Sequence, residues 1–260
     1  MTYPDQNSAS DPDNEIFRYQ SCDFIMKYVE NGSKVLDVGA GAGDGAVALP
    51  VADLCKSHVT CFDQQPDRLQ QISNLGKGLP IQTIVGDCHD LPFKEDSFDV
   101  VYSRMLLSHL PRWRDALSEQ VRVCKPGGVV IAHHLSKGIV DVLNDYFPES
   151  RVRDAVLKQR MKTTRSCATP DDFNELAEKL GCDVIETAPI GLFLANSAFF
   201  ETAFERGPAH EAFRKDYHKH LLKPDVRSFV DWFERTVTPK LAPALTEMFF
   251  TVLRTPQESR

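Results

Sequence analysis

The feature that most constrains this chain is the alternation of short apolar runs with longer helical patterns in its first half. The helical patterns lie at 45–56, 66–77 and 112–124. The apolar runs predict strands at 34–38, 58–62, 81–85, 98–102 and 129–133. Strands and helices that alternate at this spacing form βαβ units, so the sequence predicts an α/β fold with a largely parallel sheet.

Further elements are expected on both sides of this region. Thr169 and Pro170 are typical of a helix start, with Thr169 as the N-cap. Asn31-Gly32 is a typical end for the helix before it. The additional predictions are helices at 15–30, 137–165, 170–180 and 192–240, and strands at 182–187 and 248–253.

Composition narrows the classes of protein to which the chain can belong. Its 260 residues suffice for one α/β domain with an appended helical part. The formal net charge of −7 disfavours tight binding to nucleic acid, because phosphate contacts need clustered Lys and Arg. The seven cysteines are odd in number and include no CxxC pair, which disfavours a disulfide framework and a zinc site. No metal is therefore expected.

The N-terminal residues and the length of the apolar runs indicate where in the cell the protein is expected. Residues 1–14 are polar and lack the basic and apolar regions of a signal peptide, so we expect a flexible tail there. No apolar run approaches the roughly 18 residues that a membrane helix needs, so no stable membrane insertion is expected. Together with reduced thiols, these features predict a cytoplasmic protein.

The run VLDVGAGAG at 35–43 is the strongest candidate for a ligand site. It predicts a buried strand that enters a turn, where Gly39, Gly41 and Gly43 let the backbone approach a ligand closely. Asp37 would repel a dinucleotide pyrophosphate at this turn, but it can accept hydrogen bonds from an α-ammonium group. A turn without a ligand and a nicotinamide-dependent oxidoreductase are the alternatives.

Two more carboxylates follow predicted strands. Asp63 can accept hydrogen bonds from both hydroxyls of a ribose, and Gln64 beside it belongs to the same candidate site. Asp87 can accept from an adenine amino group, while the backbone N–H of Cys88 donates to the ring. The structural alternatives are a helix-capping or turn role for Asp63 and an ordinary turn role for Asp87.

The order of the motifs identifies a family. After the glycine turn and the acidic end of the second strand come GDCHDLPFKEDSFDVV at 86–101, LLSHLP at 106–111 and RVCKPGG at 122–128. In this order the chain resembles the class I methyltransferase superfamily, specifically its type-11, ubiquinone-biosynthesis-like group. The resemblance covers about residues 34–132, and the remainder of the chain carries no comparably specific motif.

The resemblance implies a Rossmann-like class I methyltransferase fold, with a seven-stranded, mostly parallel sheet, helices on both faces and helical lid insertions. The last strand would be antiparallel. It also implies S-adenosylmethionine as the cofactor, with the methionine amino group near the backbone of Ser103. Tyr19, in the N-terminal helix, would help to cover the bound cofactor. The other implied contacts are Asp37, Gly39, Gly41, Asp63, Asp87 and Cys88.

The same resemblance implies a domain organisation. The methyltransferase domain would occupy 15–260, with a cofactor-binding half at 34–135. Residues 136–168 and 192–240 would form helical substrate or lid segments. The aromatic-rich stretch at 193–233 either lines such a lid or packs in a core or homodimer, and the basic stretch at 151–165 is either a solvated helix face or an anionic docking surface.

Three histidines are candidate general bases. His109, His133 and His134 are expected near the carboxyl ends of the fourth and fifth strands, where ligands bind in open α/β sheets. Histidine titrates near neutrality, so it can accept a proton from an acidic acceptor. The alternative is a packed histidine with a structural hydrogen bond.

These features predict methyl transfer to an oxygen, nitrogen or carbon of a small-molecule acceptor, in specialised metabolism. Alignment of acceptor, methyl group and sulfur supplies most of the catalysis, so a base is needed only for a weakly acidic acceptor. The alternative from another class is a non-methylating cyclase or binding scaffold that retains the cofactor. An RNA or protein methyltransferase is a further alternative, and the acidic charge and the absence of an Asn-Pro-Pro-aromatic signature after the fourth strand count against nucleic-acid amino groups as targets.

Overall fold

The computed structural model describes residues 21–22, 24–43, 45, 47–135, 168–189 and 248–257. The expected tail at 1–14 and the expected helices at 137–165 and 192–240 lie outside these residues, as do the basic stretch and the aromatic-rich stretch. Tyr19 also lies outside them.

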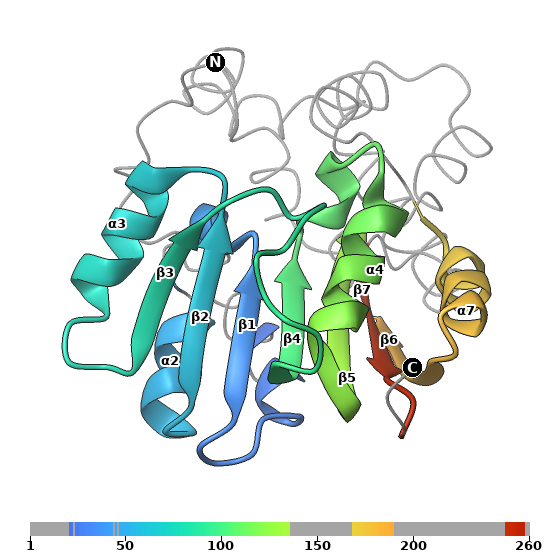
Figure 1. Cartoon of the computed structure of the whole chain (residues 1–260), viewed down its shortest axis with the longest axis horizontal. Coiled ribbons are helices and arrows are strands. Elements are labelled where there is room, and N and C mark those ends of the chain that lie inside the picture. The colour runs from blue at the N-terminus through green and yellow to red at the C-terminus, as the bar shows by residue number, and fades with distance from the viewer. Residues whose placement is uncertain are drawn as a thin grey trace, which may run out of the picture.

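The centre of the molecule is a seven-stranded sheet with the order β3-β2-β1-β4-β5-β7-β6 (Figure 1). Every strand runs in the same direction except β7, which lies antiparallel between β5 and β6. This confirms the predicted fold class and the antiparallel last strand. The strands are β1 Lys34–Val38, β2 His58–Asp63, β3 Ile81–Val85, β4 Phe98–Arg104, β5 Cys124–Leu135, β6 Asp183–Pro189 and β7 Met248–Arg254.

The helices cover both faces of the sheet. Helix α2 and the helical residues of 21–26 pack on one face together with α3, whereas α4 and α7 pack on the other (Figure 1). The described helices are α2 Ala48–Leu54, α3 Pro66–Leu75, α4 Trp113–Val123 and α7 Pro170–Lys179, with the 3-10 turns η1 Ala40–Gly43 and η2 Leu107–His109.

Three predicted boundaries were wrong by about three residues or more. The helix expected at 15–30 has its last helical residue at Met26, and a turn follows it. The helix expected at 45–56 begins at Ala48, because the preceding backbone forms a 3-10 turn and Gly45 has a positive φ of 73°. Pro50 falls in the first turn of this helix, where a missing N–H removes no intrahelical hydrogen bond. Strand β5 starts at Cys124, which pairs with Phe98 before a register shift.

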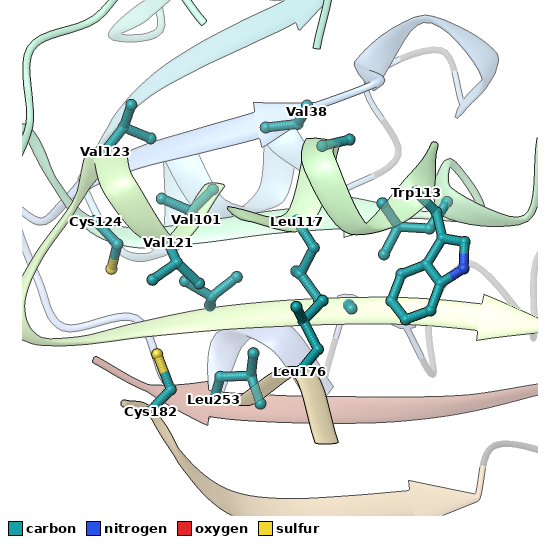
Figure 2. Close-up of a cluster of buried hydrophobic side chains, with 14 of the residues drawn as sticks. Val38, Val101, Trp113, Leu117, Val121, Val123, Cys124, Leu176, Cys182 and Leu253 are labelled. Atoms are coloured by element: carbon teal, nitrogen blue, oxygen red, sulfur yellow. The ribbon is translucent and has the colours of Figure 1, made fainter. Parts of the chain in front are cut away.

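Strand alternation divides the core into two clusters of apolar side chains. On one face, Val35 and Tyr102 pack with residues of α2. On the other face, Val38 and Val101 pack against α4 and α7, with Leu117 and Leu176 between the layers (Figure 2). Full burial of a leucine side chain contributes about 1.5–3 kcal/mol, so these two layers anchor β1 and β4 from both sides.

The start of α7 confirms the predicted cap. The Thr169 hydroxyl accepts a hydrogen bond from the Asp172 backbone N–H at 3.2 Å, and the Asp172 carboxylate accepts from the Thr169 backbone N–H at 2.8 Å. These reciprocal bonds satisfy two N–H groups of the first helical turn.

The described cysteines form no disulfide, and the described helices include no membrane-spanning candidate. The six cysteines within the described ranges are all free, and Cys167 lies outside those ranges. Among the helices that the structure describes, none combines the length and the apolar character needed to cross a membrane.

Candidate functional site

The candidate site lies where the parallel strands β1, β2 and β4 end. Strand β1 pairs with β2 on one side and with β4 on the other, which sets Asp37 opposite Cys61 and Tyr102. The next register position sets Val38 opposite Ser103. The arrowheads of these strands point to the same edge of the sheet (Figure 1). The carboxylates predicted from three separate motifs therefore share one edge.

The glycine turn after β1 is held against the end of β2. Gly39 has a φ of +80°, which favours glycine, and its N–H donates to the Phe62 carbonyl at 2.8 Å. The Gly41 N–H donates to Asp63 Oδ2 at 3.0 Å. A Cβ on Gly41 would lie 2.9 Å from Asp63 Cγ, so only glycine permits this approach. Gly43 ends the 3-10 turn.

Asp63 joins the turn to the start of α3. Its Oδ1 accepts a second hydrogen bond, from the Gln65 N–H at 2.8 Å. Gln65, not Asp63, is the N-cap residue of α3, and the contact from Asp63 to the N–H two residues later matches the turn alternative. Each carboxylate oxygen has two lone pairs, which leaves both oxygens able to accept a further hydrogen bond. Gln64 is exposed beside it.

Asp37 is a buried carboxylate with a tyrosine partner. Only 5% of the residue is exposed, and the Tyr102 hydroxyl donates to Asp37 Oδ2 at 2.7 Å. Burial raises the pKa of Asp37 to about 7, while the hydrogen bond from Tyr102 and the charge of Arg104 oppose that rise. Within the described part of the chain, Asp37 forms no ion pair. A cationic ligand group would stabilise its charged form.

The turn after β3 holds the third acidic candidate. Gly86 lies so close to the Phe62 ring that a Cβ would approach Cζ to 2.6 Å. Asp87 is exposed, and its Oδ1 accepts from the His89 backbone N–H at 2.9 Å and lies 2.6 Å from His89 Nδ1. These contacts, the backbone one first, lower the pKa of Asp87. The arrangement orients the carboxylate and leaves its other oxygen for a ligand.

Cys88 in this turn retains a neutral thiol. Burial is the first cause that raises its pKa, to about 11. The ligating atoms of Asp87, Cys88 and His89 lie within 4.8 Å of one another. A metal site would need the thiolate, which the raised pKa disfavours. The contact from the Cys88 backbone N–H to the cofactor ring stays a prediction. Sequence reasoning missed His89, although it lies two residues from Asp87.

The two histidines of β5 are core side chains. Both are fully buried, and they lie on opposite faces of the sheet. His133 stacks on Phe250, with 4.4 Å between ring centroids. His134 Nε2 accepts from the Ala168 N–H at 2.9 Å. Burial, as the first cause, lowers the pKa of His133 well below its usual value and that of His134 to about 4. This environment favours the packed-histidine alternative.

His109 and Ser103 differ in exposure. His109 is exposed in η2 and stays a candidate base. Ser103 is buried at the end of β4, between Val38 and Ala132. No hydrogen-bond partner for its hydroxyl appears among the described residues.

The sequence analysis missed Tyr102, because nothing in the sequence says which β4 residue faces Asp37.

The central segment of the chain is similar to methyltransferases. A family model described as a methyltransferase domain matches residues 36–132. The demethylmenaquinone methyltransferase of Staphylococcus epidermidis is 38% identical over 110 residues, which are 42% of this chain and 46% of that protein. The enzyme of the same name from Staphylococcus aureus is 32% identical over 120 residues, which are 46% of this chain and 50% of that protein. The chain thus spans about half the length of the curated relatives that it matches.

Solved structures share the fold at low sequence identity. The [4+2]-cyclase SpnF has a TM-score of 0.62 at 17% identity, over 98% of this chain and 86% of that chain. Phosphoethanolamine N-methyltransferase 2 of Haemonchus contortus, in complex with S-adenosyl-L-methionine, has a TM-score of 0.58 at 20% identity, over 92% of this chain and 53% of that chain. Residues 36–132 of this chain therefore match a methyltransferase-domain family, and the described structure shares the fold of these solved structures.

Proposed function

We propose that this protein transfers a methyl group from S-adenosylmethionine to a small-molecule acceptor. The observation that carries the proposal is the contact between the Gly41 N–H and the Asp63 carboxylate at 3.0 Å. It joins the glycine turn to the acidic end of β2, at the edge of the sheet where Asp37 also lies. The domain match over 36–132 supports the same cofactor.

The residues at this edge fit the chemical parts of that cofactor. Asp37, buried without an ion pair among the described residues, suits the α-ammonium group. Asp63 suits the ribose hydroxyls, and Asp87 suits the adenine amino group, with the Cys88 N–H toward the ring. Gly39 and Gly41 keep the turn open to close approach. Backbone near Ser103 and, outside the described residues, Tyr19 complete the proposed contacts.

In the proposed reaction, this chain binds the cofactor and orients it toward the acceptor. When bound, the cofactor supplies an electrophilic methyl group on a sulfonium that is already a good leaving group. The carboxylates fix the two ends of the cofactor, and in-line alignment with an acceptor is worth roughly 7–11 kcal/mol. His109 is the exposed candidate that can accept a proton where the acceptor is acidic.

The acceptor is proposed to be a small molecule of specialised metabolism. The family match ends at residue 132, and we assign the acceptor pocket to the segments 136–168 and 192–240, which the sequence predicts to be helical and which lie almost wholly outside the described residues. Because the curated relatives are demethylmenaquinone methyltransferases, a reduced quinone is the alternative acceptor. We further propose a cytoplasmic protein that binds no nucleic acid, with homodimerisation as an open alternative.

A cofactor-retaining cyclase or scaffold is the second candidate function. A solved structure of this fold is a [4+2]-cyclase, so the fold alone does not separate the two functions. Formation of S-adenosylhomocysteine during turnover of an acceptor would support the methyltransferase. Turnover of the acceptor without that product would support the cyclase.

The first test is calorimetric titration with S-adenosylmethionine and S-adenosylhomocysteine. Wild type should bind both, and Asp63→Ala should bind at least tenfold more weakly, because a hydrogen bond to a charged group contributes about 1.5–3 kcal/mol. The control is Asp53→Ala, which removes an exposed carboxylate at the end of α2. Failure of folded wild type to bind either ligand would contradict the proposed function.

A further inference from the structure

Tyr102 forms a buried polar contact to which the proposed reaction assigns no role. It lies on β4, directly opposite Asp37 of β1 in the sheet register. Its hydroxyl donates to Asp37 Oδ2 at 2.7 Å, and the tyrosine has no exposed surface. A buried tyrosine hydroxyl needs an acceptor, and here the acceptor is the carboxylate proposed to meet the cofactor.

The charged and titratable groups near Asp37 come from three strands. Strand β4 contributes Arg104, whose charge favours the ionised carboxylate, and β2 contributes Asp63, whose charge opposes it. Cys61 of β2 lies opposite Asp37 and is itself buried with a pKa above its usual range. Strand β5 brings His133 beside Arg104 in the register. Helix α2 contributes apolar side chains to this face.

These groups leave the ionisation of Asp37 finely balanced. Desolvation is the largest influence and favours the protonated form. The Tyr102 hydroxyl acts in the opposite direction, because it donates to the charged form of the carboxylate. Loss of this one hydrogen bond would therefore shift the balance toward a neutral Asp37, which attracts an ammonium group only weakly.

We infer that Tyr102 is a positioning residue whose hydroxyl favours the ionised, ligand-binding form of Asp37 against the protonated form that burial favours. Capture of the cofactor's amino-acid part then selects the ionised carboxylate and is coupled to release of a proton. This inference rests on the proposed function. The hydroxyl engages one carboxylate oxygen and restricts its rotation, which leaves the remaining acceptor capacity for the α-ammonium group. No bond to carbon or sulfur changes in this step, and the proton passes from Asp37 to solvent.

The coupling predicts a pH profile for binding. Where Asp37 is protonated before binding and ionised after it, affinity falls about tenfold for each pH unit below the midpoint. With a midpoint near pH 7, S-adenosylhomocysteine should bind wild type roughly tenfold more weakly at pH 6 than at pH 8. 5′-Methylthioadenosine, which lacks the amino-acid part, should show no such dependence.

The test compares S-adenosylhomocysteine titrations of wild type and Tyr102→Phe between pH 5.5 and 9. We expect the variant's midpoint to lie about one pH unit higher, with binding roughly fivefold weaker at pH 7 and close to wild type at pH 9. Asp37→Asn should bind weakly at every pH. The matched control is Tyr28→Phe, which removes a hydroxyl that donates to the Glu186 carboxylate of β6, at the far end of the sheet.

The outcomes separate the inference from the proposed function. Wild type that binds S-adenosylhomocysteine while Tyr102→Phe keeps the wild-type midpoint, or is weakened equally at every pH, overturns the inference alone. Wild type that binds no S-adenosylhomocysteine at any pH overturns the proposed function and the inference with it.

A second measurement needs no variant. Wild type titrated at pH 6.5 in buffers of different ionisation enthalpy should release about three quarters of a proton per ligand bound. A release near zero overturns the inference even where Tyr102→Phe fails to fold.

Discussion

At the scale of single residues, glycines decide how closely the parts of the candidate site approach one another. Gly41 lets the turn after β1 reach the Asp63 carboxylate, and Gly86 lets the turn after β3 pass the Phe62 ring. In both places a Cβ would come within 3 Å of another side chain, which is closer than van der Waals contact allows. Glycine is required there for space, so even alanine would change the site.

Gly41→Ala should therefore weaken cofactor binding. The added Cβ would lie 2.9 Å from Asp63 Cγ and 3.0 Å from Arg68 Cβ, so Asp63 must move away from the turn. We expect at least a tenfold loss of affinity for S-adenosylhomocysteine, equivalent to about 1.4 kcal/mol or more, in a calorimetric titration. Gly78→Ala is the control, since no atom lies within 4 Å of its added Cβ and its positive φ affects stability alone. Unchanged affinity in Gly41→Ala would contradict this account of the turn.

At the scale of elements, β5 shows how strand alternation separates neighbouring residues. His133 points into the face that carries α2, and His134 points into the face that carries α4 and α7. His134 also accepts a hydrogen bond from the Ala168 N–H, which ties β5 to the residue just before the Thr169 cap of α7. A histidine in this position serves as a buried acceptor, which requires the neutral ring.

His134 should make the fold sensitive to acid. Its pKa is about 4 in the folded protein and near 6.5 when unfolded, so between these values the unfolded chain binds more protons. Stability is thus intact above pH 6.5 and is lost as the pH falls toward 4. Linkage gives a loss of roughly 2 kcal/mol between pH 7 and pH 5 from this residue.

The measurement is urea denaturation of wild type and His134→Phe at both pH values. The variant should be less stable at pH 7 by about 1–3 kcal/mol, because the Ala168 N–H loses its acceptor, but it should lose less stability on acidification. The acid sensitivity that remains in His134→Phe is assigned to His133, because burial also lowers the pKa of that histidine. The exposed His58 offers the control His58→Phe, which should follow wild type. Equal losses in wild type and His134→Phe would contradict the assignment.

At the scale of the whole molecule, β7 joins the two ends of the described chain. It lies between β5 and β6 and runs against both, so the last residues of the chain complete the sheet. Phe250 of β7 is fully buried and stacks on Phe24 at 4.2 Å and on His133 at 4.4 Å. The helical residues near the start of the chain therefore depend on a strand from its end.

Truncation of Phe250 should destabilise the entire domain. Phe250→Ala removes both ring contacts and leaves a cavity, which costs about 3–5 kcal/mol in a buried position. Phe250→Leu, which refills most of the space, should cost markedly less. Urea denaturation followed by fluorescence and by circular dichroism tests this, with the two signals expected to change together. A loss below about 1 kcal/mol for Phe250→Ala would show that β7 and the N-terminal helical residues are not coupled through this ring.

Much of the fold and of the cofactor edge could be predicted from the sequence, because both depend on local patterns. Apolar periodicity located each strand that the structure describes, and the parallel order implied that Asp37, Asp63 and Asp87 lie at or just after the ends of strands that share one edge. The Thr169 cap was likewise visible, since a capping box lies within a few consecutive residues.

Only the tertiary structure decided which side chains meet from strands that are distant in the sequence. The pairing of Tyr102 with Asp37 depends on the register of β4 against β1, which local periodicity does not specify. The burial of His133 and His134 depends on β7 and on α7, which come much later in the chain. A side chain's position along its strand follows from the sequence, but its partner and its protonation follow from the packing of the neighbouring strands and helices.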